Sequence, residues 1–142
     1  MQAWLLYSTL SALMAALVAI FGKLGLKNID STLATTIRSI IMAAFLIITS
    51  ISLKKFNNFS FESILLKDWI LIGLAGIAGA LSWLFYFFAL KNGDATKVVT
   101  VDRMSLVFVA IFAFMFLGES LKWQQLIGVI MMVGGAILIS IF

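Results

Sequence analysis

Residues Trp69–Leu90 read WILIGLAGIAGALSWLFYFFAL, a run in which no side chain carries a charge. A helix of this length, at a rise of about 1.5 Å per residue, spans the hydrocarbon core of a bilayer, which is about 30 Å thick. Lipid offers no hydrogen-bond partner to backbone N–H and C=O groups, so a spanning segment is either a helix or a strand of a closed barrel. The run is continuously apolar rather than alternating, which predicts a transmembrane helix.

Four further stretches are long and apolar enough to span a bilayer: Trp4–Gly22, Leu33–Leu53, Val98–Leu117 and Leu121–Phe142. Together with Trp69–Leu90 they fill most of the 142 residues and leave only short connections. Short connections force neighbouring helices to run antiparallel. The sequence therefore predicts an all-α integral membrane protein, in which residues 1–142 form one domain of five transmembrane helices with the lipid bilayer as its surroundings.

The composition excludes several classes of protein. Hydrophobic residues make up 63% of the chain and charged residues 11%, which leaves no room for a soluble domain. The net charge is +4, but the basic residues are dispersed along the chain, so we expect no nucleic-acid partner. Cysteine and histidine are absent, and no nucleophile–base set or pair of carboxylates shares a helix face. We therefore expect no metal site, no cofactor and no enzymatic activity.

Tryptophans mark one face of the predicted bundle, which we call side A; the opposite face is side B. Trp4, Trp69 and Trp123 all lie at side-A helix ends, where aromatic anchors are usual. Lysines are balanced, with Lys54, Lys55, Lys67 and Lys122 on side A and Lys23, Lys27, Lys91 and Lys97 on side B. The positive-inside rule therefore leaves the orientation open. Insertion in both orientations requires such a balance, although a small protein with short loops often has it too.

Three charged residues are predicted to lie at membrane depth near side B. Arg38 lies about 8 Å into the second span, and Asp102 and Arg103 lie about 6–8 Å into the fourth. A charge at this depth costs a few kcal/mol, which makes such residues functional candidates. Arg38 and Asp102 form the predicted ion pair; alternatively, the long side chain of Arg38 reaches the headgroups. For Arg103, this snorkelling is the favoured interpretation.

One face of the third span carries residues at steps of three and four positions: Gly76, Gly79, Ala80, Trp83 and Phe87. Tyr86 lies beside this face. The small residues permit close helix packing, and the aromatic residues, with one cation and one anion nearby, would suit a small amphipathic organic solute. Ordinary packing is the alternative, because small residues are common at membrane helix interfaces.

Small residues also form stripes on the first and fifth spans. Ser11, Ala15 and Ala19 follow one another at four-residue steps on the first span, and Ser8, Ala12 and Ala16 lie on an adjacent face. Gly128 and Gly135 lie one heptad apart on the fifth span. Both patterns predict helix packing. Beyond Lys122 at its side-A end, the fifth span carries no ionisable residue, so we expect it to be peripheral or to contact a second copy.

The sequence also resembles a known family. The run of residues 90–105, LKNGDATKVVTVDRMS, is similar to the junction between the third and fourth helices of EamA-type proteins, which belong to the drug/metabolite transporter superfamily. Further similar segments are FGKLG (21–25), ATTIR (34–38), SWLFY (82–86) and LGE (117–119). The resemblance covers the whole chain as one five-helix repeat, where many relatives carry two fused repeats.

This resemblance implies that the first four helices line a pathway and that the fifth packs outside it. Members move amino acids, other metabolites and drugs, usually outward. The related four-helix small multidrug resistance proteins use a carboxylate in the first helix for proton coupling. The first span here carries no acid, so that mechanism does not carry over.

The resulting hypothesis is a secondary transporter, an exporter of a small organic metabolite or drug, in the cell (inner or plasma) membrane. It would work by alternating access as a homodimer, with each copy supplying half of a ten-helix inverted-repeat architecture, in an antiparallel or a parallel arrangement. Its substrate-binding residues would be Arg38, Trp83, Tyr86, Phe87 and Asp102, with Arg38 and Asp102 pairing as the gate. The alternative is a membrane scaffold or a subunit of a hetero-oligomeric complex. Substrate identity and energy coupling stay open.

Overall fold

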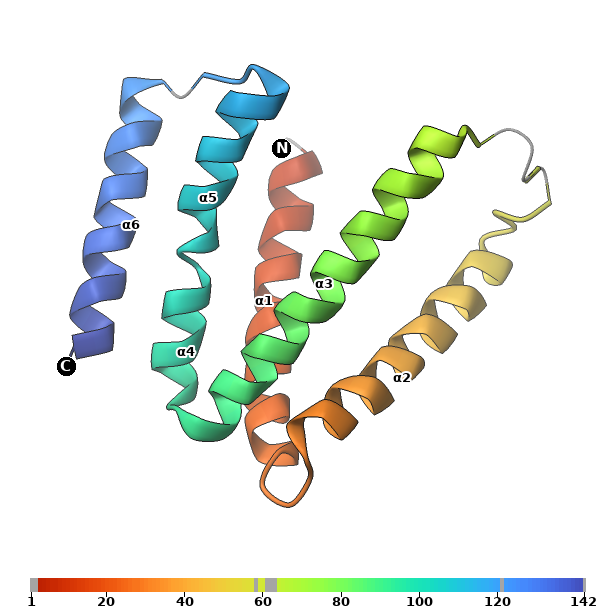
Figure 1. The fold of residues 1–142 in the computed structure, drawn as a ribbon, viewed down its shortest axis with the longest axis horizontal. Helices are drawn as coiled ribbons and strands as arrows, with labels where there is room; N and C mark the ends of the chain where they lie inside the picture. The colour runs from red at the N-terminus through yellow and green to blue at the C-terminus, as the bar shows by residue number, and fades with distance from the viewer. Residues whose placement is uncertain (1–2, 58, 61–63, 121, 142) are drawn as a thin grey trace. The chain divides into compact units, whose positions relative to one another are not determined.

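The computed structural model describes residues 3–57, 59–60, 64–120 and 122–141. Within these residues the chain is helical and contains no strand (Figure 1). The elements are α1 (Ala3–Gly25), α2 (Ser31–Ser52), α3 (Leu66–Asn92), α4 (Ala95–Asp102), α5 (Ser105–Phe112), the π-helical segment η2 (Ala113–Leu117) and α6 (Trp123–Ile141). Five helical stretches are long and apolar enough to cross a membrane, with α4, α5 and η2 together forming one of them. The prediction of an all-α membrane fold with five spans is confirmed.

The helices belong to two compact units. The first unit contains Met1–Lys23 and Asn92–Phe142, and the second contains Leu24–Lys91. The first unit therefore holds most of α1 together with α4, α5, η2 and α6, whereas the second holds α2 and α3. Arg38, Trp83, Tyr86 and Phe87 all lie in the second unit.

The fourth span differs from the continuous helix expected over Val98–Leu117. It begins earlier, at Ala95, and is interrupted by a turn at Arg103 and Met104. There the N–H groups of Met104, Leu106 and Val107 donate to carbonyls three residues back, over 2.9–3.2 Å. Residues 98–101 are all β-branched, which weakens the helix, and the Thr100 hydroxyl donates to the Thr96 carbonyl at 2.7 Å. Such back-bonding bends helices, so the interruption follows from local chemistry without proline or glycine.

Helix ends are fixed by short polar contacts. At the start of α2, Asp30 Oδ1 accepts hydrogen bonds from the N–H groups of Thr32 at 2.9 Å and Leu33 at 3.2 Å and so caps the helix. The Leu33 bond is the main reason that the pKa of Asp30 lies below its ordinary value. At the end of η2, Gly118 adopts a φ of 68°, and the Glu119 N–H donates to the Ala113 carbonyl at 3.2 Å. Asp68 lies inside the first turn of α3.

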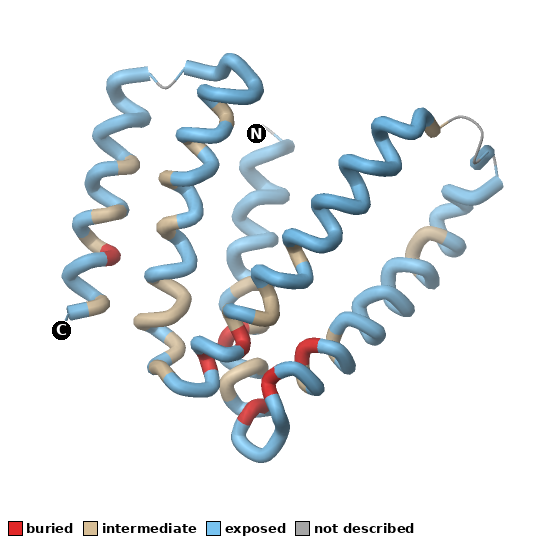
Figure 2. Tube along the Cα trace, viewed as in Figure 1, coloured by how far each residue is buried: buried red, intermediate tan, exposed pale blue. Residues whose placement is uncertain are grey.

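The second unit has a small core at one end of its two helices. Its buried residues are Leu26, Ser31, Thr35, Phe87 and Leu90, and Figure 2 shows the buried segments gathered at the start of α2 and the end of α3. The ammonium of Lys91 donates to the Ile29 carbonyl at 3.1 Å and ties the loop before α2 to the end of α3. Away from this end, α2 and α3 expose large apolar side chains, as expected for surfaces that face lipid or another copy.

The hydroxyl of Ser31 is a buried polar group that makes no hydrogen bond with the described residues. Ser31 itself is fully buried. We expect Ser31→Ala to raise the thermal midpoint of unfolding in detergent by a few degrees, because a buried unsatisfied hydroxyl costs about 1–3 kcal/mol. The matched control is Thr35→Val, which should lower the midpoint because the Thr35 hydroxyl donates to the Ser31 carbonyl at 2.7 Å. A lowered midpoint for Ser31→Ala would contradict this account.

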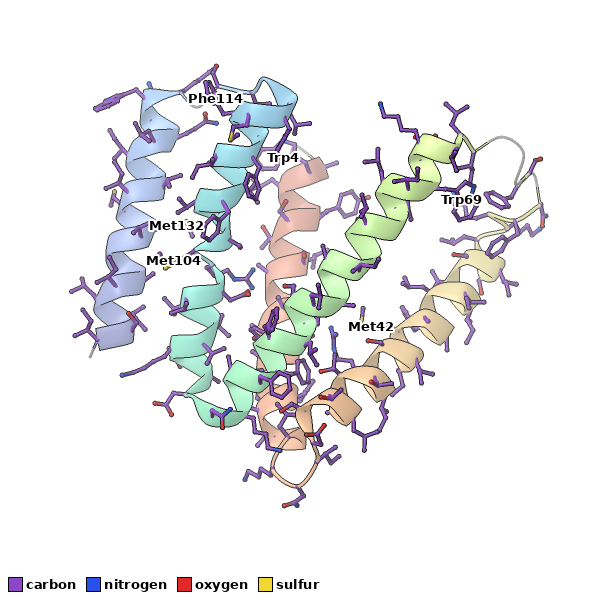
Figure 3. All side chains as sticks on the ribbon, in the orientation of Figure 1. Trp4, Met42, Trp69, Met104, Phe114 and Met132 are labelled. Atoms are coloured by element: carbon purple, nitrogen blue, oxygen red, sulfur yellow. The ribbon has the colours of Figure 1, made fainter. Side chains whose placement is uncertain are left out.

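In the first unit, α4 packs against α6, and the two helices run side by side (Figure 1). Figure 3 shows Met104 and Met132 between these helices, and Ala136 of α6 is buried. Lys23, at the end of α1, donates to the Gly93 carbonyl at 2.7 Å. A Cβ added at Gly128 or Gly135 would meet no atom of the described residues within 4 Å. Their predicted role in helix packing therefore stays a prediction.

Candidate functional site

Arg38 lies on α2 and stacks on aromatic side chains of α3. The Arg38 Cζ atom lies 3.6 Å from the ring centroid of Trp83 and 5.7 Å from that of Phe87. Both distances fall within the range of cation–π attraction. Trp83 and Phe87 are four residues apart, so they lie on one helix face, and this face is the one that meets Arg38. The helical period of the sequence therefore places the two rings correctly.

The three aromatic residues form one cluster of edge-to-face contacts. The ring centroids of Trp83 and Tyr86 are 5.4 Å apart, those of Trp83 and Phe87 are 6.0 Å apart, and those of Tyr86 and Phe87 are 6.1 Å apart. Phe87 is buried, whereas Arg38, Trp83 and Tyr86 are half-buried. The cluster thus has an inner ring that anchors it and an outer surface that other molecules can reach.

The guanidinium of Arg38 forms no ion pair with the described residues of the second unit. The acidic residues described there are Asp30, whose carboxylate caps α2, and Asp68, which lies at the opposite end of α3. The N–H groups of a guanidinium stacked on an indole point outward in the plane of the guanidinium itself, where they can donate to an acceptor. The arrangement can therefore bind a planar or apolar group on the rings and an anionic group at the edge of Arg38.

The known proteins most informative for this chain come from one family. The chain matches the EamA-like transporter family over residues 2–141. It belongs to this family. The EamA-like chain is also 38% identical over 141 residues to a Sinorhizobium protein named "Uncharacterized transporter in cobO 3'region", with 99% of each chain covered. No solved structure gives a significant match.

This membership gives the EamA-like chain its general function. It is a multi-pass membrane protein of a transporter family, and its relative carries the name of a transporter. Both findings favour a transporter over the enzyme class and over the scaffold that the sequence left open. The family resemblance seen in the sequence is confirmed.

Other predicted site residues of the EamA-like chain are placed differently. Asp102 is exposed at the end of α4 in the first unit, so its pairing with Arg38 of the second unit stays a prediction. Ala80 is exposed, and a Cβ added at Gly76 or Gly79 would meet no described atom within 4 Å. The predicted packing of this small-residue face therefore stays a prediction.

Sequence reasoning missed a second polar region, in the first unit. Arg103 lines an open groove with Tyr7, Ser8 and Ser11 of α1, and it also lines a cavity between α4 and α6. The serines were noticed in the sequence but were interpreted as a packing stripe, and Arg103 was interpreted as snorkelling. The overlooked signal was the coincidence of hydroxyl groups on one span with an unpaired arginine on another.

Proposed function

We propose that this EamA-like chain is a homodimeric secondary transporter that exports a small organic metabolite or drug by alternating access across the inner or plasma membrane. The observation that carries the proposal is the stack of Arg38 on Trp83, half-buried in two spanning helices, without a carboxylate partner among the described residues of its own unit. A charge at membrane depth costs a few kcal/mol, so a cation kept there without a protein counter-ion points to an intermittent partner. The partner that we propose is the solute.

The gate of the proposed transporter is the ion pair Arg38–Asp102. When solute leaves the aromatic cluster, the Arg38 guanidinium binds Asp102 and closes that end of the pathway. When solute binds, its own polar group replaces the carboxylate at Arg38, and Trp83, Tyr86 and Phe87 hold its apolar part. Exchange of one partner for the other couples solute binding to gate opening, because the solute then has different contacts in the two states.

A second copy supplies the other half of the proposed pathway. In each spanning stretch at most 6% of the residues of its most apolar part are buried inside the protomer. Most of the surface of these helices is therefore free to contact lipid or a partner helix. Five helices are an odd number, which lets two copies inserted in opposite senses form a ten-helix inverted repeat. In that arrangement each copy places one Arg38–Asp102 gate near one membrane face.

The export function is tested by profiling metabolites. Cells that express the chain should accumulate a specific small organic compound in the medium, and cells that lack it should retain that compound. The control is an Arg38→Gln variant expressed to the same level in the membrane. Identical profiles for the chain, the variant and the empty strain would overturn the proposed function.

Dual insertion makes a separate prediction about topology. We expect C-terminal fusions to two reporters, one active only in the cytoplasm and one only outside, both to give signal, because the lysines are balanced four against four. Adding Asn57→Lys and Asn58→Lys to the side-A loop should force one orientation and abolish transport. Co-expression of a copy with the opposite bias should restore it. Signal from one reporter alone would exclude the antiparallel dimer and leave the parallel one.

A further inference from the structure

Arg103 lies well inside a spanning stretch. It is the ninth residue of Ala95–Leu117, which puts it about 12 Å along the helix from the start of that stretch. The stretch begins three residues before Val98, where the sequence alone predicted it to begin. A charge within a spanning stretch is a functional candidate, and snorkelling to the headgroups is the alternative.

No group among the described residues of the first unit neutralises Arg103. Among the described residues of this unit, none forms an ion pair or a hydrogen bond with its guanidinium. Asp102 is its neighbour in sequence, but consecutive side chains at the end of a helix point in different directions. Arg103 is therefore a cation at membrane depth that its own unit leaves available to a ligand.

The groove beside Arg103 is rich in hydroxyl groups. It has a volume of about 400 Å³ and is lined by Tyr7, Ser8, Ser11, Ala12 and Ala15 of α1. Within the described part of the first unit, the hydroxyls of Tyr7, Ser8 and Ser11 have no hydrogen-bond partner. By contrast, Thr9 of the same helix donates to the Leu5 carbonyl at 2.8 Å. Three free donors and one arginine thus meet in one groove.

On its other side, Arg103 borders an apolar cavity between α4 and α6. The cavity has a volume of about 270 Å³, and its lining is apolar except for Arg103 and Thr100. Met104 and Met132 contribute to its walls. At Gly135, which also lines the cavity, an added Cβ would meet no described atom within 4 Å. A cation and hydroxyl donors beside an apolar cavity of this size complement a small molecule with an anionic group and an apolar body.

We propose that Arg103, with the hydroxyls of Tyr7, Ser8 and Ser11, binds the carboxylate of a small apolar organic anion whose apolar part occupies the cavity between α4 and α6. The site belongs to the first unit, whereas the aromatic cluster around Arg38 belongs to the second. Its assignment to a transported solute rests on the proposed function, but binding of the anion does not.

The binding test uses the fact that Arg38 and Arg103 are the only arginines of the sequence. Protein labelled with ¹⁵N-arginine and placed in nanodiscs of zwitterionic lipid gives two side-chain Nε–H signals, which Arg38→Lys and Arg103→Lys assign. Benzoate should shift the Arg103 signal saturably. Benzylamine, which has the same ring and the opposite charge, should leave it unmoved. Both sodium benzoate and benzylamine hydrochloride are used at equal ionic strength.

Matched serine and threonine variants test the hydroxyl groups. Ser8→Ala combined with Ser11→Ala should weaken benzoate binding about tenfold, because hydrogen bonds to a charged group are removed. Thr9→Ala should leave the affinity unchanged, since the Thr9 hydroxyl is already occupied by the Leu5 carbonyl. Equal effects of the two changes would overturn the assignment of the groove.

Three results would overturn the proposed site itself. They are an Arg103 signal that benzoate does not move, one that benzylamine moves equally, and one that moves only when phosphatidylglycerol is added to the nanodiscs, which would indicate a lipid headgroup instead. Failure of the transport proposal is distinguished from failure of the binding site by the metabolite profile of the medium. If the wild-type chain exports a compound and Arg103→Gln exports it equally well, the anion bound at Arg103 is not the transported solute, while the transport function stands.

Discussion

Trp83→Ala is expected to lower the affinity for the transported solute about tenfold or more, while membrane insertion and dimerisation stay intact. The change removes the ring that lies 3.6 Å from the Arg38 guanidinium and contacts both Tyr86 and Phe87. A cation–π contact away from bulk water contributes about 2 kcal/mol, and the stacking area for the solute is lost as well. The change adds no charge and buries none, so the protein should still fold. The measurement is solute binding to purified protein, alongside membrane expression.

The matched control for Trp83→Ala is Phe85→Ala. Phe85 lies on the same helix, is 65% exposed and takes no part in the aromatic cluster. Its replacement should leave solute affinity unchanged, and Trp83→Phe should retain most of the affinity because a ring remains under Arg38. Degradation of Trp83→Ala in the membrane would mean that Trp83 serves packing and that the solute binds elsewhere.

Changes to the proposed gate should have the other large effect. Arg38→Ala is expected to abolish transport, because it removes both the solute contact and the partner of Asp102. It should also lower the yield of inserted protein, since an unpaired carboxylate at membrane depth costs about 2.5–3.5 kcal/mol. Combining Arg38→Ala with Asp102→Asn should restore insertion but not transport. Both outcomes are measured as membrane yield and as export into the medium.

A charge reversal tests direct pairing across the gate. Arg38→Asp combined with Asp102→Arg should recover part of the transport that each single reversal loses. Full recovery is not expected, because the arginine would then no longer lie on the Trp83 ring. Arg38→Lys gives the comparison, since it keeps the charge but loses the planar stack. If Arg38→Ala and Asp102→Asn each transport normally, neither residue belongs to the gate.

The candidate site shows which of its features can be predicted from the residue pattern of a single helix. The spacing of Trp83 and Phe87 predicted one aromatic face, and the depth of Arg38 predicted a charge at the same level. Both predictions depend on the helical period and rise, which are properties of a single helix. The partner of the Arg38 guanidinium was harder to predict. In the second unit the residue contacts an indole ring, and this contact depends on how α2 and α3 are rotated about their axes.

The sequence by itself determined the five spans and the family of the protein, because the length of each apolar run and the order of the motifs are properties of the linear sequence. Only the tertiary structure decided that Arg38 stacks on Trp83 and that Arg103 meets the hydroxyls of α1 beside an apolar cavity. The interruption of the fourth span at Arg103 and Met104 has a local origin, but it arises from several weak preferences that add up, so the apolar pattern did not predict it. The physical reason is that contacts between helices depend on their relative rotation and spacing, and side chains from distant parts of the chain fix both.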